Sequence, residues 1–460
     1  MPWTRLTTLL LAAAGAFHLH RAFSLAVTTD EAFTAIAFAS PPWLEILTSY
    51  DANHHVLHSL LCKLSLSLFG WNALALRLPS LLACLLFFTI ARRLFPGSPL
   101  QLVLCAWLAF HPALYDWFSL ARGYSLALAF LLAALYELSG PLPTLTRASI
   151  FLGLSAASNF VFAIPAAAVA LAWTAARKSW TRLPHLAVPG AALALIITAI
   201  PLSRAEGANF YYGAPNLLES FRSLFAIPHL DFVSALLIAA VPFTLAAALW
   251  YSRRDETLRF FTLSLTLCLL AAAVLRLAGI PFPYGRTGAY ITLLWILSTF
   301  ALAARLDDAS QSRLFVFRLI PDKFLVFNGL KRNAETIASP GGRPWLWAAL
   351  LAPAALFVFT IPTGFARPWQ YDAGNRAVMD HLLQSGAAQP SIAASPMLVP
   401  GLEFYRRRPA SAHWPRVKTF TAESSPAYLI LRTDEPPAQP PAGYTPIFRD
   451  LVSGIVLFRR

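Results

Sequence analysis

The chain has 460 residues, of which 57% are hydrophobic and only 13% are charged. Soluble domains have about 25% charged residues, so the composition argues against a soluble globular enzyme and for a membrane protein. The net charge of +14, from 36 Lys and Arg against 22 Asp and Glu, is typical of a nucleic-acid-binding protein or of a membrane protein with basic cytoplasmic loops, and the positions of the charges decide between them.

Eleven apolar stretches are predicted to cross the membrane as helices, because about 20 apolar residues span the hydrocarbon core of a bilayer. In chain order they are 7–27, 73–91, 98–114, 123–138, 148–159, 161–176, 185–202, 231–251, 258–277, 288–304 and 344–362. The first is long for the core of a cleaved signal peptide, so we expect a retained helix. The stretches 148–159 and 161–176 are short for two crossings, and one long bent helix is the alternative.

The charges of the loops favour two helices in 148–176. With residue 1 in the cytoplasm, the first outer loop, 28–62, has no Lys or Arg, and the long inner segment 305–343 has seven. The other basic residues of the inner loops are Arg92, Arg93, Arg147, Arg177, Lys178, Arg182, Arg253, Arg254 and Arg259. This distribution follows the positive-inside rule and places the C-terminal tail outside. It also sets nucleic-acid binding aside, because the positive charge divides by membrane side and forms no single basic face.

Two further segments are predicted from their composition. The run 313–320 mixes apolar and basic residues, which suits an element on the inner membrane surface. From about residue 363, Pro and Gly rise and charges return, with a helix-like piece at 373–383 and strand-like runs at 428–431 and 454–458. We therefore expect a membrane domain, 1–362, and a small extracytoplasmic α/β domain, 363–460.

The first polar cluster, Thr28-Thr29-Asp30-Glu31, directly follows the first span. Thr-x-x-Glu is the pattern of a capping box at a helix start, and the spacing alone favours this structural interpretation. A carboxylate at the membrane boundary is also able to accept a proton from a substrate hydroxyl. Both interpretations hold together, since the cap uses Glu31 and leaves Asp30 free.

The second cluster lies in the same outer loop and contains Asp51, Asn53, His54, His55 and His58. On a helix, His54 and His58 are one turn apart, so they are the candidate pair for a metal ion or a charged ligand. Histidines that only form hydrogen bonds are more common at such positions. We expect no required cofactor, and the sequence leaves open whether a divalent ion assists.

Two arginines mark outer ends of later spans. Arg122 follows Asp116 and precedes Tyr124, and Arg286 follows Tyr284 in a Pro- and Gly-rich connection. Either side chain can extend to the lipid headgroups. The alternative is that the two guanidinium groups bind a lipid-linked phosphate, for which the arginine fork is well suited.

Another boundary cation, Arg77, enters the second span in Leu76-Arg77-Leu78-Pro79-Ser80. Together with the Asp-Glu pair after span one, the outer-loop Asn-His-His, Ala121-Arg122-Gly123-Tyr124 and Tyr284-Gly285-Arg286, this motif resembles the GT-C superfamily of integral membrane glycosyltransferases. The similarity is to the protein mannosyltransferase-like and aminoarabinose-transferase-like enzymes, glycosyltransferase family 39 and its relatives. It covers about 1–305.

The resemblance implies an all-α polytopic GT-C fold of about 11 transmembrane helices in a bacterial inner membrane, with the small α/β domain outside. It implies transfer of a sugar, with inversion, from a polyprenyl-phosphate donor to an extracytoplasmic protein, lipid or glycan acceptor. By match, Asp30 is the base and Glu31 its acidic partner. Arg77, Arg122 and Arg286 are candidates for the donor phosphate. The candidates for sugar or acceptor binding are Asp51, Asn53, His54, His55, His58, Asp116, Tyr124 and Tyr284.

A transporter or flippase for a lipid-linked or anionic substrate is the alternative function. The middle parts of most predicted spans lack charged residues, so no polar path across the membrane is evident. A non-catalytic assembly or receptor protein is a third interpretation, and it leaves the outer-loop Asp and His cluster without a role.

Overall fold

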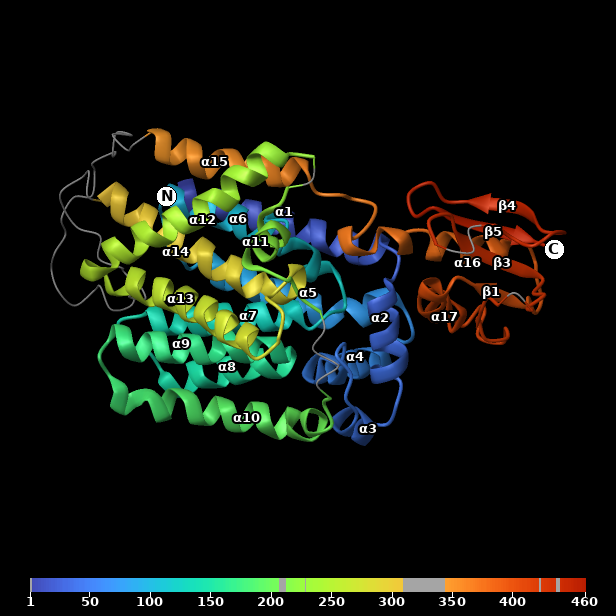
Figure 1. Ribbon diagram of the computed structural model, residues 1–460, viewed down its shortest axis with the longest axis horizontal. Helices are drawn as coiled ribbons and strands as arrows, with labels where there is room; N and C mark the ends of the chain where they lie inside the picture. Colours follow the sequence, from blue (N-terminus) through green and yellow to red (C-terminus); the bar gives the residue numbers. More distant parts are fainter. Residues whose placement is uncertain (1, 207–211, 228, 309–343, 422, 436–438) are drawn as a thin grey trace.

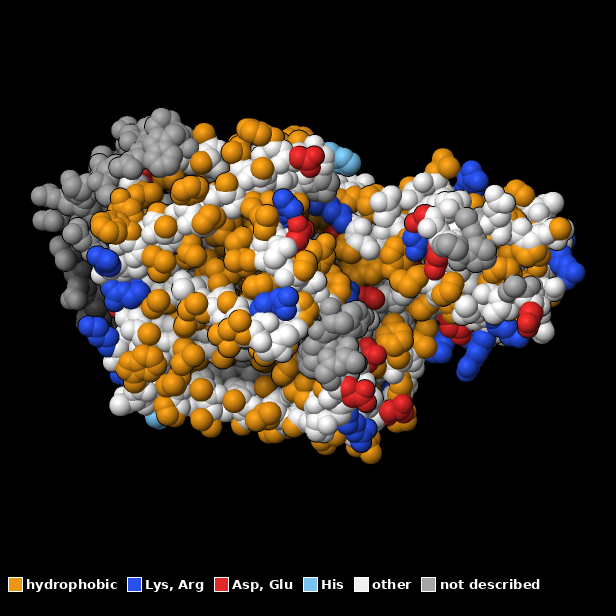
Figure 2. All heavy atoms as spheres, in the orientation of Figure 1, with side chains coloured by type: hydrophobic (Ala, Val, Ile, Leu, Met, Phe, Trp, Pro, Cys, Tyr) orange, Lys and Arg blue, Asp and Glu red, His pale blue; other side chains and the backbone are white. Residues whose placement is uncertain are grey.

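Most of the chain forms one bundle of helices, and its C-terminal part forms a small sheet domain at one end of that bundle (Figure 1). The structure is a computed structural model that describes residues 2–206, 212–227, 229–308, 344–421, 423–435 and 439–460. The predicted surface element at 313–320 lies outside these residues. On the face shown in Figure 2, apolar side chains cover most of the bundle, and Lys and Arg lie at the end away from the sheet domain as well as on the sheet domain itself.

Eleven helices coincide with the eleven apolar stretches. They are α1 Pro2–Ser24, α5 Ala73–Ala91, α6 Pro99–Phe110, α7 Tyr124–Ser139, α8 Leu145–Ser158, α9 Ala163–Ala176, α10 Leu183–Ser203, α12 Asp231–Tyr251, α13 Glu256–Leu277, α14 Ala289–Asp308 and α15 Pro344–Phe359. Within the described ranges, five helices are long and apolar enough to cross a membrane unaided, α5, α10, α12, α13 and α14. The protein is therefore an integral membrane protein.

The stretch 148–176 forms two helices, not one bent helix. Asn159 leaves the helical conformation at the end of α8, with φ −158° and ψ 116°, and its side chain accepts a hydrogen bond from the N–H of Val161. α8 packs mainly against α7 and α10, whereas α9 packs mainly against α13. The separate neighbours show that each helix buries a face of its own.

Short helices lie in the connecting segments at the end of the bundle that faces the sheet domain. These are α2 Thr29–Phe33, a π-helical segment Thr34–Ala39, α3 Trp43–Thr48, α4 Val56–Phe69 and α11 Leu217–Phe225. α1 and the segment Thr29–Ala39 meet at a bend of 73°. This bend turns the chain out of the bundle directly before Asp30.

The C-terminal domain is the expected small α/β unit. Its helices are α16 Asn375–Gln384 and α17 Val399–Arg406, and its strands are β1 Ile392–Ala394, β2 Lys418–Thr419, β3 Tyr428–Arg432, β4 Thr445–Arg449 and β5 Ile455–Arg459. The sheet order is β2-β1-β3-β5-β4, with β1 parallel to β2 and β3, and β5 antiparallel to β3 and β4. The runs predicted as helix and strands match α16, β3 and β5.

A shared apolar core joins the sheet domain to the bundle. Val27, Ala32 and Leu76 of the bundle belong to the same buried cluster as Leu402 and Phe404 of α17. The indole N–H of Trp71 also donates to the carbonyl of Phe404, at 2.9 Å. α2 lies at this junction (Figure 1), so the Asp30 region contacts both parts of the protein.

Candidate functional site

The turn that begins α2 is the capping box that its sequence predicts. Thr28 has extended backbone angles, φ −75° and ψ 159°. Its N–H donates to Glu31 Oε2 at 3.0 Å, and the N–H of Glu31 donates to Thr28 Oγ1 at 3.3 Å. The cap uses a backbone donor at each end and leaves the intervening carboxylate of Asp30 free to point elsewhere.

Glu31 also forms a fully buried ion pair with Arg77. Nε and Nη2 of Arg77 donate to the two carboxylate oxygens, each at 2.7 Å, and neither side chain is exposed. The carbonyls of Ala22, Leu25 and Ala26 accept the other three guanidinium protons at 2.9 Å. All five N–H donors of Arg77 are therefore in use, which leaves none for a donor phosphate.

Asp30, in contrast, meets two guanidinium groups from distant parts of the chain. Arg286 Nη1 donates to Asp30 Oδ2, and Arg122 Nη2 lies 3.4 Å from the same oxygen. Arg122 is 1% exposed, whereas Asp30 and Arg286 are 15% and 20% exposed. In the described part of the chain, one carboxylate thus faces two cations, and one positive charge has no carboxylate partner.

Aromatic rings hold Arg286 in place. Its guanidinium carbon lies 4.6 Å from the centre of the Tyr212 ring and 5.9 Å from that of Trp369. The ring of Tyr284, which is 40% exposed, packs edge-on against Tyr212. Rings restrain the guanidinium without using its N–H donors, so Arg286 keeps donors for a ligand. Sequence reasoning missed Tyr212 and Trp369, whose only signal is aromatic type.

Arg122 is connected to the second polar cluster through Asn53. Asn53 Oδ1 accepts from Arg122 Nη2 at 2.9 Å, and Asp51 Oδ1 accepts from the N–H of Asn53 at 2.7 Å. Arg122 Nη1 also reaches the Asp30 carbonyl at 3.4 Å. The segment with Asn53 and the start of α7 are therefore joined to the Asp30 turn by hydrogen bonds from the guanidinium of Arg122.

The three histidines have different environments. His55 packs edge-on against Tyr124, and burial together with the Arg122 cation lowers the pKa of His55 well below 6.5. His54 stacks on Phe38 at 4.2 Å and contacts a backbone carbonyl at 3.1 Å. His58 lies inside α4 beside Ser80. His55 is thus a neutral imidazole next to the two arginines.

No metal site is visible among the described residues. No group of three or more His, Cys, Asp or Glu side chains in these ranges is placed to hold an ion. The ring of His54 turns to the carbonyl of Ser49, whereas His58 lies 3.6 Å from the thiol of Cys62. The two predicted ligands therefore face different partners.

Asp116, predicted to bind substrate, instead lies in a separate buried ion pair. Arg21 Nη2 donates to Asp116 Oδ1, and Arg21 Nη1 donates to the carbonyl of Pro362 at 2.5 Å. Arg21 is fully buried and Asp116 nearly so. The ion pair ties the end of α1 to the segment Tyr115–Ser119, and the bond to Pro362 ties it to the segment after α15. Sequence reasoning missed Arg21 because it counted that residue as part of the first span.

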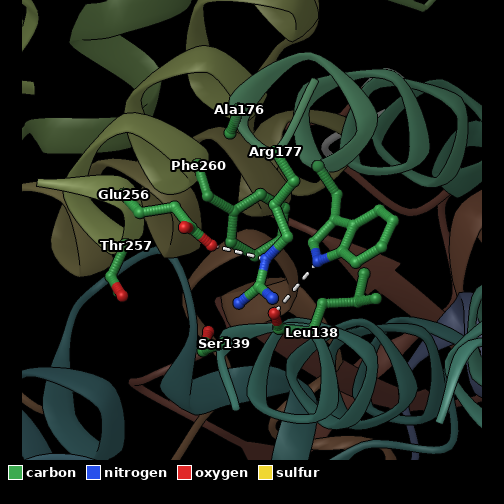
Figure 3. Close-up of a pocket in the computed structure, with 8 residues that line it drawn as sticks. Leu138, Ser139, Ala176, Arg177, Glu256, Thr257 and Phe260 are labelled. Carbon is green, nitrogen blue, oxygen red and sulfur yellow. Dashed lines mark hydrogen bonds and ion pairs between the residues drawn. The ribbon is translucent and has the colours of Figure 1, made fainter. Parts of the chain in front are cut away.

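A small hollow lies at the other end of the bundle, and its charged groups are paired with each other, unlike the two arginines at Asp30. Its lining residues are Leu138, Ser139, Trp173, Ala176, Arg177, Glu256, Thr257 and Phe260 (Figure 3). Arg177 Nε pairs with Glu256 at 2.5 Å, and the indole of Trp173 donates to the carbonyl of Leu138. α7, 16 residues long, separates this hollow from Arg122 by about 24 Å, and the local pairing gives it a structural role.

Gly123, between Arg122 and α7, is expected to tolerate no side chain. A Cβ there would lie 2.1 Å from the carbonyl oxygen of Ser158 and 2.8 Å from Cβ of His55. We expect Gly123→Ala to lower the free energy of unfolding by about 1–3 kcal/mol, because backbone must move. Thermal unfolding in lipid nanodiscs measures this. Gly15→Ala in α1 is the control, since no heavy atom lies within 4 Å, and equal effects of the two changes would contradict the assigned clash.

Comparison with solved structures shows a similar fold along nearly the entire chain. ArnT from Cupriavidus metallidurans bound to undecaprenyl phosphate aligns with a TM-score of 0.54 and 16% identity, over 98% of this chain and 97% of ArnT. The apo state of the same protein aligns with a TM-score of 0.53, 16% identity and the same coverage. No protein-family profile and no curated protein sequence matches the chain. The predicted GT-C architecture is confirmed, and the chain has the fold of ArnT.

Proposed function

We propose that this protein is a membrane glycosyltransferase that moves a sugar from a polyprenyl-phosphate donor to an extracytoplasmic acceptor. The observation that carries the proposal is the pairing of one carboxylate, Asp30, with two guanidinium groups, Arg122 and Arg286. The phosphodiester of such a donor supplies the one negative charge that Asp30 and the two arginines together lack. ArnT, whose fold the chain shares, has been crystallised with undecaprenyl phosphate, which supports a lipid of this class.

The proposed reaction uses the site as follows. The acceptor hydroxyl or amine gives its proton to the Asp30 carboxylate, and its lone pair attacks the anomeric carbon from the face opposite the phosphate. The bond between that carbon and the phosphate oxygen breaks, and the polyprenyl phosphate leaves with one more negative charge. Two arginines beside the leaving group stabilise this charge most strongly in the transition state.

The contacts also suggest how donor binding prepares the base. Arg286 donates to Asp30, so a phosphate and the Asp30 carboxylate compete for the same guanidinium. When the phosphate binds, Asp30 loses part of its hydrogen bonding and becomes available to the acceptor. Donor binding would thus precede activation of the acceptor.

The remaining predicted residues divide into two roles in this proposal. Asn53, His55 and Tyr124, which surround Arg122, orient the sugar, with Asp51 and His54 supporting the loop and Tyr284 at the entrance. Glu31 and Arg77 hold the turn in place and do not touch the donor. His58 and Asp116 lie in buried contacts of their own, so we assign them structural roles. No step needs a cofactor.

The charge distribution supports a bacterial inner-membrane location with the site outside. Arg177 lies at the far end of α7 from Arg122, and the end with Arg177 also gathers Lys and Arg (Figure 2). Basic ends of membrane bundles face the cytoplasm. The N-terminus is then cytoplasmic, and Asp30 and the sheet domain are extracytoplasmic.

Transfer in proteoliposomes tests the function. The donors are synthetic polyprenyl phosphates carrying mannose or aminoarabinose, and the acceptors are protein, lipid and glycan fractions of a bacterial envelope. Release of free polyprenyl phosphate with labelling of one acceptor fraction supports the proposal and identifies the acceptor class. Movement of the intact donor across the bilayer, with no sugar released, would instead establish the flippase alternative.

Removing Arg286 is expected to weaken binding of undecaprenyl phosphate by roughly 10- to 100-fold. Hydrogen bonds to charged groups contribute about 1.5–3 kcal/mol, and each 1.4 kcal/mol is a factor of about ten. Titration of Arg286→Gln in nanodiscs measures the change. Arg222→Gln is the matched control, because Arg222 is also on an outer segment but is 56% exposed and paired with Glu219. Equal affinities of the two variants would remove Arg286 from the phosphate site.

A further inference from the structure

Asp372, in the segment between α15 and α16, is hydrogen-bonded to Thr29, the residue before Asp30. Asp372 Oδ2 accepts from the backbone N–H of Thr29 at 2.6 Å, and Asp372 Oδ1 lies 2.9 Å from the Thr29 hydroxyl. The side-chain amide of Asn375 donates a hydrogen bond to Asp372 Oδ1 at 2.8 Å. Asp372 is only 1% exposed. Burial of a carboxyl with this many partners is costly unless each hydrogen bond is made, which indicates a specific contact.

Other contacts join the sheet domain to the same stretch of chain. The Thr29 hydroxyl lies 2.7 Å from the carbonyl of Met397, and the N–H of Val27 donates to the phenol oxygen of Tyr405 at 2.8 Å. Gly401 of α17 approaches Asn375 so closely that a Cβ would lie 2.3 Å from the amide nitrogen. Several residues of the sheet domain therefore contact the segment from Val27 to Thr29 directly.

Three consecutive residues of the turn therefore bond to both the C-terminal segment and the bundle. Thr29 bonds to the C-terminal segment, Glu31 bonds to the bundle through Arg77 and Ala121, and Asp30 between them points to Arg122 and Arg286. With both neighbours fixed, the backbone of Asp30 has little freedom. Trp369, in the segment that ends at Asp372, also packs against Arg286.

We propose that Asp372 is a positioning residue, through which the C-terminal domain sets the place of the Asp30 carboxylate for transfer. This inference rests on the proposed function, since it assumes that Asp30 is the base. The C-terminal domain then contributes to the rate of transfer by holding the turn that carries Asp30. Asp372 itself touches neither donor nor acceptor.

The protonation of Asp372 supplies a readout that a merely structural contact lacks. Burial raises the pKa of Asp372 from 3.8 to about 7, and the nearby Asp30 charge adds to this shift. The other titratable and charged groups facing this region are the Tyr371 phenol and Arg432, which lies 4.5 Å from the Tyr371 ring. Because the folded protein binds this proton more tightly than the unfolded chain, the contribution of Asp372 to stability is complete below about pH 4 and is lost as the pH rises through 7.

The test compares Asp372→Ala with Asp372→Asn, using the polyprenyl-phosphate mannose or aminoarabinose donor that supports wild-type turnover. Alanine is expected to lower kcat by roughly 10- to 100-fold through misplacement of the base, while KM for the donor stays within about twofold because both arginines remain. Asparagine keeps a donor and an acceptor without a titratable proton. It should restore kcat to within about threefold and remove part of the fall in unfolding temperature between about pH 5 and pH 8.

Controls separate this inference from the proposed function. Asp380→Asn changes a half-exposed carboxylate of α16 that pairs with Arg408, away from the Asp30 turn, and should leave kcat and the pH dependence unchanged. If Asp372→Ala keeps wild-type kcat while Asp30→Asn is inactive, the positioning role is wrong and the function stands. If Asp30→Asn is active, the function itself fails. Should Asp372→Ala not fold, Thr29→Val decides, because it removes only the hydroxyl contacts, and an unchanged kcat overturns the inference.

Discussion

Asp30→Asn is expected to lower the rate of sugar transfer by about 10²- to 10⁴-fold, the contribution of a positioned general base. The amide has the size of the carboxylate but does not accept the acceptor's proton. Undecaprenyl phosphate should bind at least as tightly as to the wild type, because Arg286 and Arg122 no longer share their donors with a carboxylate. Single-turnover transfer and lipid titration measure the two effects separately.

The combination of lost transfer and retained binding is the specific signature of a base. Asp380→Asn changes a half-exposed carboxylate outside the site, and it serves as the control for any general effect of losing a negative charge. A folded Asp30→Asn protein with near-wild-type turnover would exclude Asp30 as the base. Loss of lipid binding together with turnover would instead show that Asp30 acts by holding the arginines in place.

The local features of the site were predictable from the sequence. The spacing of Thr28 and Glu31 predicted the capping box, and the boundary positions of Arg122 and Arg286 singled them out before any contact was known. Each of these signals lies in a few adjacent residues, because a helix start or a membrane boundary is set locally. The eleven apolar segments were predicted for the same reason, since the bilayer imposes a length and a composition on each one.

The partners of these residues were not predictable. Arg77 was assigned to the donor phosphate, but three of its acceptors are backbone carbonyls at the end of α1, and carbonyls have no sequence signature. Asp372 contacts Thr29 across 343 positions, and no pattern in a single sequence reports such a distance. Asp116 was grouped with Arg122 because they are neighbours in the chain, whereas its charge is paired with Arg21.

Glu31→Gln is expected to lower the free energy of unfolding by about 3–5 kcal/mol, the usual effect of breaking a buried ion pair from one side. The capping box survives, because glutamine still has an acceptor for Thr28. Both carboxylate oxygens of Glu31 accept from Arg77, and one also accepts from the N–H of Ala121 at 2.6 Å. Whichever oxygen of Glu31 the NH₂ group of glutamine replaces, it then faces an N–H donor. The buried guanidinium of Arg77 is also left without a counter-charge.

A double variant shows whether the charge itself is the cause. Arg77→Met alone leaves the Glu31 carboxylate buried and unpaired, whereas Glu31→Gln with Arg77→Met leaves no buried charge and should recover part of the lost stability. Arg147→Ala provides the exposed comparison. Its pair with Glu137 has the same 2.7 Å separation, but Arg147 is 60% exposed, so the expected change is about 0–1 kcal/mol. Equal losses for the two pairs would mean that burial does not govern the Glu31 contact, and that the turn bearing Asp30 is held mainly from the side of the C-terminal domain.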